Sequence, residues 1–384
     1  MIFSHISDTH LGFVQYHSEE REEDVYHSFN QAIDISIKDH VNFVIIAGDI
    51  FHVPNPSGKA IVVLGNALKR LRQNNIDSFF ILGEHDISRI RATPVPFVYH
   101  NLEYAKYIGN GKPFFYNNVL IAGFDKRRKN EIHTFENDFI SVDNIAKNHN
   151  GHAILVLHQG ISEINKFAGE LNSTDLPRSF SYYAMGHLHE KELKQFHHLK
   201  GPLAYPGSIE ITSSEGIKET QKGFYEVDIS HTEALPNWIK LDTRPQISVK
   251  TSYDSLINEV NSLCEKIKSY DRKPIVELKI SGEKLEPGII QGQISKLSEL
   301  TLRCFWKLVS VQQVNDQVFI ERPLKIEDEM HRLAIEILGS EELANFAINE
   351  LLPILSKGNT EEANHIINEN FTRFKVGLRN ATIS

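Results

Sequence analysis

The sequence predicts an α/β layered fold. In the first half of the chain, short apolar runs typical of buried strands alternate with longer segments that have helical periodicity. A second β-α-β pattern follows after residue 245, and the chain beyond Pro323 has only helical patterns. These three observations predict a layered main domain, a small α/β module and a helical C-terminal segment.

The N-terminal half supplies most of the predicted sheet. Apolar runs predict strands at residues 2–6, 43–47, 79–82, 119–122, 153–157, 182–185, 203–205 and 223–229. Residues 21–38 predict a helix, because Val25, Phe29 and Ile33 recur at four-residue spacing. After a loop at 54–58, a second helix carries an apolar stripe of Ile61, Leu64, Leu68 and Leu71. We expect this stripe to pack in the core, with an exposed dimer face as the alternative.

The rest of the chain predicts two further parts. A boundary is expected near Thr243, followed by strands at 247–250, 275–280, 302–309 and 318–320 and helices at 253–267 and 287–297. Pro323 breaks this pattern, and helices are expected at 327–338, 341–355 and 360–374. We therefore predict domains at residues 1–242, 243–322 and 323–384.

Composition favours an ordinary globular protein. The 384 residues carry a net charge of −9, with 41% hydrophobic and 24% charged residues. This charge argues against a nucleic-acid coat protein but does not exclude a nuclease, because metal cations hold phosphate directly. No apolar run approaches the roughly 18 residues that span a bilayer, and Met1 leads straight into the first strand. From these two observations we expect a protein that is not membrane-bound. Cys264 and Cys304 suggest no disulfide framework, so we also expect the protein to be intracellular and cytoplasmic.

Five short segments carry metal-binding residue types, and each follows a predicted strand. They are Asp8-Thr9-His10, Gly48-Asp49, Gly83-Glu84-His85-Asp86, His158-Gln159 and Gly186-His187-Leu188-His189. Residues i and i+2 of an extended segment project to the same side, so Asp8 and His10 are expected to grip one ion. The same spacing joins His187 and His189. Gly48 allows a sharp turn that exposes Asp49 at the sheet edge.

Carboxylates and imidazoles delivered from several strand ends predict a metal centre. The mixture suits Mn²⁺, Fe²⁺ or Zn²⁺, and the candidate ligands are too many for one ion. Two ions roughly 3.5–4 Å apart are the usual clamp for phosphoester hydrolysis, with Asp49 as the expected bridge. Each motif also has an ordinary explanation: Asp-x-His occurs by chance, His158 caps a buried strand, and Gly-Asp forms a turn. The order of all five at strand exits favours metal.

These motifs resemble the signature of the calcineurin-like metallophosphoesterase superfamily, which runs D-x-H, G-D, G-N-H-[DE], H and G-H-x-H. Longer strings at residues 3–12, 47–52, 157–160 and 182–189 look like the Mre-eleven/SbcD DNA-repair nucleases, and residues 204–210 and 222–225 match later strings of that family. The resemblance is dense over residues 1–230, and the domain order beyond looks most like the archaeal members. It implies a metallophosphoesterase β-sandwich flanked by helices, with a small α/β capping domain and a C-terminal helical segment.

The resemblance also implies a role for each site residue. One metal ion would be held by Asp8, His10, Asp49 and His189. A second would be held by Asp49, Glu84, His158 and His187, with Asp49 bridging the two. His85 would lie beside the scissile phosphate and protonate the leaving oxygen or donate to the transition-state oxygens. His52 matches a family histidine near the substrate phosphate, with a loop histidine in solvent as the alternative.

Glu84 departs from the family pattern, which has Asn at this position. Its carboxylate adds negative charge beside two other carboxylates, although it remains a competent oxygen ligand for Mn²⁺. Two outcomes are open: Glu84 ligates and tightens the second metal site, or it distorts that site and lowers activity. We expect ligation.

The function implied by the resemblance is a DNA nuclease of double-strand-break repair with two Mn²⁺ per chain. We expect exonuclease activity on duplex ends and endonuclease activity on single strands. We also expect a homodimer and a Rad-fifty/SbcC-type coiled-coil ATPase that binds the C-terminal helices. The protein is expected to associate with the nucleoid. The alternatives are a general metallophosphoesterase acting on small phosphodiesters and a weakly active scaffold that binds DNA ends. Candidate phosphate contacts in the capping module, with a solvated charged face as the alternative, are Lys266, Lys268, Arg272, Lys273 and Lys279.

Overall fold

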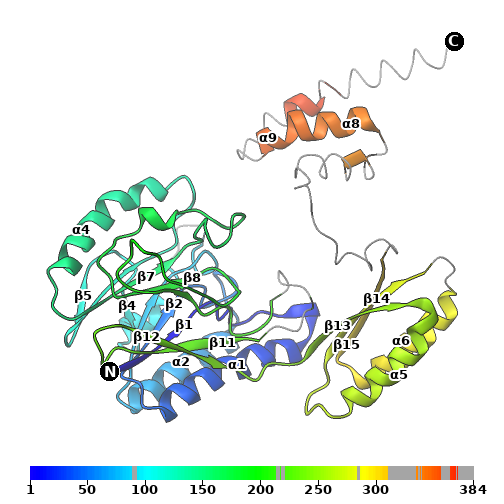
Figure 1. Cartoon of the computed structure of the whole chain (residues 1–384), viewed down its shortest axis with the longest axis horizontal. Helices are drawn as coiled ribbons and strands as arrows, with labels where there is room; N and C mark the ends of the chain where they lie inside the picture. The colour runs from blue at the N-terminus through cyan, green and yellow to red at the C-terminus, as the bar shows by residue number, and fades with distance from the viewer. Residues whose placement is uncertain are drawn as a thin grey trace. The chain divides into compact units, whose positions relative to one another are not determined.

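The computed structural model describes residues 1–88, 93–212, 217, 221–282, 286–309, 334–335, 338, 340–355, 364–368 and 370. The chain divides into two compact units, residues 1–311 and 312–384. In the first unit, two six-stranded sheets pack face to face between helices, and a three-stranded sheet forms a separate module (Figure 1). The predicted α/β fold with a helix-flanked sandwich is therefore confirmed.

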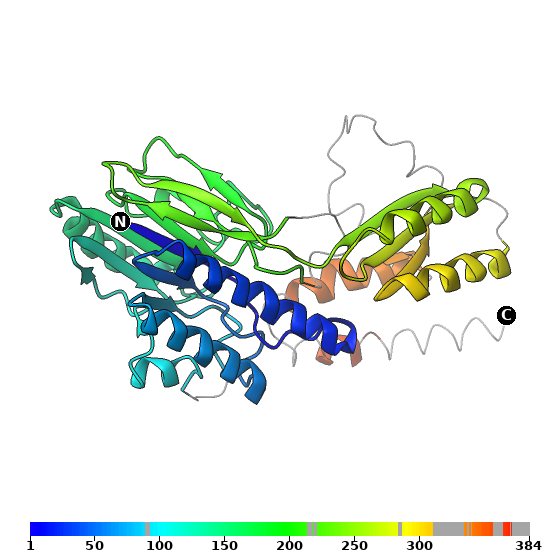
Figure 2. The same cartoon turned by 90° about the horizontal axis from the view of Figure 1, so that it is seen from below.

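The first sheet is built mainly from parallel strands. Its order is β12 (Leu235–Lys240), β11 (Gly223–Asp228), β1 (Ile2–Ile6), β2 (Phe43–Ala47), β3 (Asp77–Ile81) and β4 (Lys106–Tyr107). Strands β1 to β4 run parallel, and β11 and β12 are antiparallel additions at one side. Helices α1 (Glu19–Lys38) and α2 (Gly58–Gln73) lie side by side (Figure 2) and pack on its outer face.

The second sheet has the order β5 (Phe114–Tyr116), β6 (Val119–Phe124), β7 (His152–His158), β8 (Tyr182–Gly186), β10 (Leu203–Tyr205) and β9 (Glu192–Lys194). Strands β6, β7, β8 and β10 are parallel. Helix α4 (Phe135–Lys147) covers its outer face through Phe135, Phe139 and Val142. A short helix, α3 (Phe97–Asn101), precedes β4.

The core of the sandwich explains why the central strands are almost entirely apolar. On β2, Phe43 and Ile45 point to the interior between the sheets, whereas Val44 and Ile46 pack under α1 and α2. Both faces of the strand are buried, so alternation of apolar and polar residues is absent. Each fully buried side chain of this size contributes roughly 1.5–3 kcal/mol. The stripe of α2 is core as predicted, because Leu64, Leu68 and Leu71 are buried.

Several elements of the sandwich were not predicted from the sequence: the short elements α3, β4, β5 and β9, and also α4 and β12. Helix α4 lies in a stretch for which no element was expected. Strand β12 contains Pro236, a residue that argues against a strand because it cannot donate a ladder hydrogen bond. Since β12 is the edge strand of its sheet, Pro236 is tolerated opposite Val227 of β11.

The third sheet forms the small module predicted after residue 243. Its parallel strands are β13 (Gln246–Ser252), β14 (Ile275–Ser281) and β15 (Arg303–Leu308), and they pack with α5 (Leu256–Ile267) and α6 (Pro287–Leu300) around a core of their own. Several of its cationic side chains are engaged within the protein: Lys268 with Glu265, Lys279 with Glu277, and Arg272 with Asp242. These contacts favour a structural or solvated role for the charges over a preformed phosphate-binding patch.

The second unit is described only in part. Residues 341–355 form one continuous helical stretch, made of α8 (Glu341–Phe346), a π-helical turn (Ala347–Leu351) and α9 (Leu352–Leu355), as predicted. The strand expected at 318–320 lies outside the described residues, and so do most of the helices expected at 327–338 and 360–374. The three-domain division at residues 242 and 322 therefore stays a prediction. In the part of the chain that the structure describes, no helix combines the length and apolar character needed to cross a membrane.

Candidate metal centre

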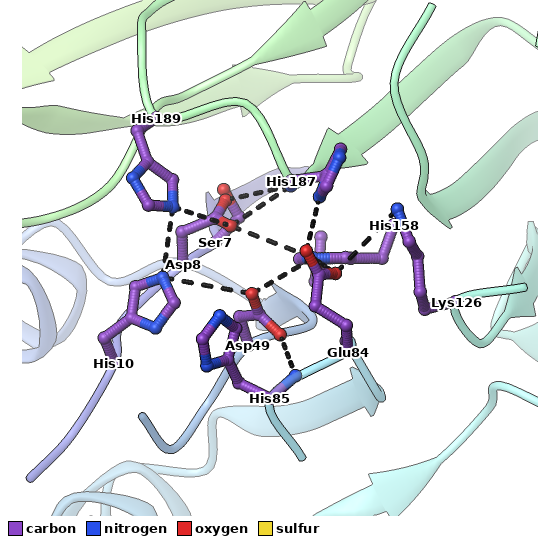
Figure 3. A network of polar contacts seen from close by, with 12 residues as sticks. Ser7, Asp8, His10, Asp49, Glu84, His85, Lys126, His158, His187 and His189 are labelled. Atoms are coloured by element: carbon purple, nitrogen blue, oxygen red, sulfur yellow. Dashed lines mark hydrogen bonds and ion pairs between the residues drawn. The ribbon is translucent and has the colours of Figure 1, made fainter. Parts of the chain in front are cut away.

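Five loops that follow parallel strands converge on one point between the two sheets (Figure 3). Strands β1, β2 and β3 of the first sheet and β7 and β8 of the second end at this edge. The loops bring together all seven predicted metal ligands: Asp8, His10, Asp49, Glu84, His158, His187 and His189. The predicted catalytic residues His85 and His52 lie in the same cluster.

The backbone around Asp8 and His10 differs from the expected extended segment. Both residues have positive φ angles, 52° and 42°, and Asp49 has 49°. The expectation of a strand-like alternation was therefore wrong here, because the chain turns sharply as it leaves β1. The amides of Asp8 and His10 donate to the carbonyls of Gly48 and Asp49, at 3.1 and 3.0 Å, and this ties the two turns together. Left-handed non-glycine residues cost about 1–3 kcal/mol each and cluster at functional sites.

Two glycines make room for the converging side chains. Gly48 has a φ of 87°, and a Cβ atom there would lie 2.4 Å from Nδ1 of His158. A Cβ atom on Gly83 would lie 2.1 Å from Oδ1 of Asp49. Glycine is therefore required at both positions for His158 and Asp49 to occupy the centre.

One group of donors surrounds Glu84. Its Oε1 lies 2.8 Å from Nδ1 of His187, and its Oε2 lies 3.0 Å from Nε2 of His158. Burial acts to raise the pKa of Glu84, but the two imidazoles together hold it well below its usual range. Glu84 is therefore an ionised carboxylate placed between two histidines, and its expected ligation of a metal ion stays a prediction.

A second group contains Asp8, His10 and His189. The Nε2 atoms of His10 and His189 face each other at 3.1 Å, and Nε2 of His189 lies 3.9 Å from Oδ1 of Asp8. Asp8 also accepts the backbone amide of His187 at 3.1 Å. Burial lowers the pKa of His10 well below its usual value, so this imidazole is a neutral donor near pH 7.

Asp49 lies between the two groups. Its Oδ2 is 3.4 Å from Nε2 of His158 and 3.9 Å from Nε2 of His10, and its Oδ1 accepts the amide of His85 at 2.9 Å. Burial raises its pKa, but the neighbouring His158 prevails and lowers it to about 2. An ionised carboxylate that contacts both groups has the position expected of a bridge.

The donor set fits divalent cations, and His158 provides the test. Its Nδ1 lies 2.7 Å from the carbonyl oxygen of Ala47, which accepts only, so Nδ1 carries a proton. Nε2 of the same ring faces the carboxylates of Asp49 and Glu84 at 3.4 and 3.0 Å. Burial acts to lower the pKa of His158, but these two carboxylates raise it well above its usual value. A buried Nε2 between two carboxylates needs a positive charge, which a proton supplies here and a bound cation would supply in its place. Among the described residues the buried Nδ1 of His10 has no hydrogen-bond partner, and mixed nitrogen and oxygen donors suit a divalent transition metal.

His85 and His52 lie beside these donors in a different arrangement. Nδ1 of His85 donates to the carbonyl of His52 at 2.7 Å, because that carbonyl only accepts. The rings of the two residues stack with centroids 5.3 Å apart, and the ring of His10 lies 4.9 Å from that of His85. Burial and the neighbouring His85 lower the pKa of His52 to about 4, so His52 is neutral near pH 7.

Three residues that the sequence did not assign support the centre. Asp86 accepts the backbone amides of Ile50, Phe51 and Gly83 at 3.0–3.1 Å and so fixes two of the loops. Thr212 lies 3.0 Å from Nδ1 of His189 through its hydroxyl. Lys126 lies next to Glu84. Asp86 is part of the third motif, whereas Thr212 and Lys126 give no signal of their own in the sequence.

Comparison with known proteins agrees with this geometry. Residues 1–203 match the family model of the calcineurin-like phosphoesterases. The DNA double-strand break repair protein Mre11 of Thermoplasma acidophilum is 34% identical over 294 residues, which cover 73% of this chain and 76% of that protein. The chain belongs to the Mre11 (Mre-eleven/SbcD) family.

Further Mre11 relatives extend the match. The protein of Methanocaldococcus jannaschii is 33% identical over 292 residues, which cover 74% of this chain and 77% of its own. The Mre11 protein of Saccharolobus solfataricus is 29% identical over 377 residues, which cover 95% of this chain and 96% of that protein. The family resemblance predicted from the motifs is confirmed, and with it the assignment of the chain as a metal-dependent phosphodiesterase of the Mre11 nuclease family.

Proposed function

We propose that the centre holds two divalent cations that share Asp49. One cation is held by Asp8, His10, Asp49 and His189, and the other by Asp49, Glu84, His158 and His187. The observation that carries this proposal is the pair of donor groups on either side of Asp49, together with the buried Nε2 of His158 that faces the carboxylates of Asp49 and Glu84. Mn²⁺ is the proposed ion, because it accepts both carboxylate and imidazole ligands.

The reaction proposed for this site is hydrolysis of a phosphodiester. When bound, the cations supply an activated water and stabilise the charge that builds on the phosphoryl oxygens. His85 has no ligand role in this scheme. Its Nδ1–H donates to the carbonyl of His52, which fixes the orientation of the ring and leaves Nε2 for proton transfer to the leaving oxygen. The neutral His52 orients His85 through that carbonyl and packs against its ring.

DNA is the proposed substrate. The relatives are named as DNA double-strand break repair proteins, and the proposed activities are exonuclease on duplex ends and endonuclease on single strands. Because the net charge is −9, we propose that the metal centre or a basic partner supplies much of the phosphate affinity. A general phosphodiesterase and a weakly active scaffold at DNA ends are the competing functions.

Digestion of defined substrates separates these functions. End-labelled duplex DNA, circular single-stranded DNA and bis-p-nitrophenyl phosphate are incubated with the protein and Mn²⁺, with EDTA as the control. The proposal expects shortening of the duplex from its ends and cutting of the circle. Hydrolysis of the small ester with both DNA substrates intact would leave a general phosphodiesterase, and retention of duplex ends without any cleavage would leave a scaffold.

We further propose a homodimer and an ATPase partner of the Rad50/SbcC type. Support for the dimer comes from three exposed apolar side chains: Val62 of α2, Val98 of α3 and Leu102 directly after α3, which are 59%, 48% and 57% exposed. Support for the ATPase contact is the helical stretch at 341–355, whose position agrees with the predicted partner-binding segment. Val62→Glu with Leu102→Glu should give a monomer in sedimentation analysis, and an unchanged dimer would contradict this surface.

A further inference from the structure

Lys126 is a buried cation next to the proposed metal centre. It follows β6, and its backbone amide donates to the carbonyl of Leu82 at 2.9 Å. The preceding residue, Asp125, accepts the amide of Leu82 at 2.8 Å. These two bonds fix Lys126 beside the end of β3, where the loop that carries Glu84 begins. Its side chain is only 8% exposed.

The ammonium group of Lys126 has two carboxylate neighbours. Nζ donates to Oε2 of Glu170 at 2.7 Å, which satisfies the charge that burial would otherwise penalise. The same oxygen of Glu170 accepts the amide of Gly160, two residues after His158. Nζ also lies 3.9 Å from Oε2 of Glu84, too far for a strong hydrogen bond but close enough for a Coulomb interaction (Figure 3).

This arrangement places a fixed positive charge against the Glu84 side of the centre. Asp8, Asp49 and Glu84 bring three negative charges into a small volume, and each attracts cations. A divalent cation held by Glu84, His158 and His187 would be repelled by an ammonium group that lies 3.9 Å from the same carboxylate oxygen. Because Lys126 is almost fully buried, solvent screens this repulsion weakly.

We propose that Lys126 is a positioning residue that sets the affinity of the Glu84 subsite for divalent cations by offsetting the charge of Glu84. Glu170 holds the ammonium group in place for this role. The inference rests on the proposed metal centre, since it assigns the Glu84, His158 and His187 group to a cation. It makes a directional claim: removing the positive charge tightens metal binding, although it also removes a buried ion pair.

Titration calorimetry of the metal-free chain with MnCl₂ alone tests the claim. Lys126→Met keeps the length of the side chain without its charge, and we expect one of two Mn²⁺ sites to bind on the order of ten-fold more tightly. Lys126→Arg keeps the charge and should bind as the parent does. Lys147→Met, at the exposed C-terminal end of α4, makes the same charge change away from the site and should leave both affinities unchanged.

A second variant keeps the test decisive if Lys126→Met does not fold. In Glu170→Gln the ammonium group loses its compensating charge, so Mn²⁺ should bind several-fold more weakly at the same subsite. Glu136→Gln in the first turn of α4 is its matched control. Combining Glu84→Gln with Lys126→Met should restore an affinity close to that of the parent.

The outcomes distinguish this inference from the proposed function. A parent chain that binds no Mn²⁺ would overturn the metal centre and the role of Lys126 together. A parent that binds two ions, with affinities that Lys126→Met leaves unchanged or weakens, would overturn the role of Lys126 alone. Weakening in Lys126→Met that Lys126→Arg does not rescue would assign Lys126 to local packing instead.

Discussion

His85 differs from the other imidazoles of the centre in how it contacts the carboxylates. The ligand candidates His158 and His189 use Nδ1 to anchor the ring to Ala47 and Thr212 and direct Nε2 at carboxylates. His85 is anchored to the carbonyl of His52, and its contact with Asp49 is made by its backbone amide. The side chain is therefore available for proton transfer without being needed to hold a cation.

Replacing His85 by alanine tests this division. We expect His85→Ala to lower the turnover number by about 10²–10⁴-fold, the usual contribution of a positioned acid or base. Metal stoichiometry, measured by calorimetry, should stay at two ions per chain. Loss of one ion in this variant would identify His85 as a ligand, and the same measurement on His158→Ala, for which metal loss is expected, provides the comparison.

At the scale of single residues, the sequence predicted which side chains gather at the centre better than it predicted their backbone conformation and their neighbours. Asp8, Asp49 and His187 were predictable because each lies directly after an apolar run that has to become a buried strand. Lys126 was not predictable, since its contact with Glu84 joins residues that are 42 positions apart in a chain whose register only the fold supplies. The left-handed turns at Asp8 and His10 were missed for a similar reason, because hydrogen bonds to a different loop stabilise them.

Helix α1 carries a buried charge cluster that joins the sandwich to the segment leading into the third sheet. Asp24 accepts from Arg21 at 2.6 Å and from Arg244 at 2.6 and 3.0 Å. Arg21 is fully buried and also contacts Glu210 at 3.3 Å. Removing one partner from such a cluster leaves uncompensated charge in the interior.

Asp24→Asn should therefore destabilise the protein by about 3–5 kcal/mol, measured as the free energy of unfolding in urea. Asp34→Asn on the same helix is the matched control, because its ion pair with Arg70 is exposed and should contribute less than about 1 kcal/mol. Equal losses in the two variants would show that the cluster contributes no more than a surface pair.

Strand β11 contains a glutamate whose protonation should make stability depend on pH. Glu226 lies opposite Ser4 of β1, and its Oε1 atom is buried without a hydrogen-bond partner among the described residues. Burial, with help from the charge of Asp39, raises its pKa from 4.5 to about 7. Because the folded-state pKa is the higher one, its favourable contribution is complete below pH 4.5 and is lost as the pH rises through 7.

Glu226→Gln should remove this loss. The variant and the parent should have similar free energies of unfolding at pH 4.5, and the variant should be more stable by about 1 kcal/mol at pH 8. Urea denaturation at the two pH values measures the difference. A constant difference between the two proteins across this range would mean that Glu226 ionises normally in the fold.

Helices and strands were predicted correctly where the spacing of apolar residues determines the secondary structure. Strand β12 was missed because pairing with the neighbouring strand determines its conformation. The five strands that lead into the centre and helices α1, α2, α5 and α6 were predictable from the spacing of apolar residues alone. Strand β12 has two polar residues and Pro236, and it is stabilised by its complete pairing with β11. Nothing in its own sequence indicates that pairing.

For the molecule as a whole, we expect that cleavage of DNA does not require the C-terminal helices of the second compact unit. Deleting residues 326–384 removes the predicted partner-binding helices and leaves the sandwich and the three-stranded sheet. We expect the truncated chain to retain Mn²⁺-dependent cleavage within about two-fold of the full chain. Binding to a coiled-coil ATPase of the Rad50/SbcC type, measured by co-purification, should be lost, and its survival would place the contact elsewhere.

The convergence of five loops on one centre has a consequence for folding kinetics. The proposed ligands come from residues 8 to 189 and from both sheets of the sandwich, so they are expected to come together only after the sheets have docked. Contacts formed after the transition state change the unfolding rate and leave the folding rate unchanged. Saturating Mn²⁺ should therefore lower the unfolding rate and leave the folding rate unchanged, which would make bound cations a source of kinetic stability for the native state.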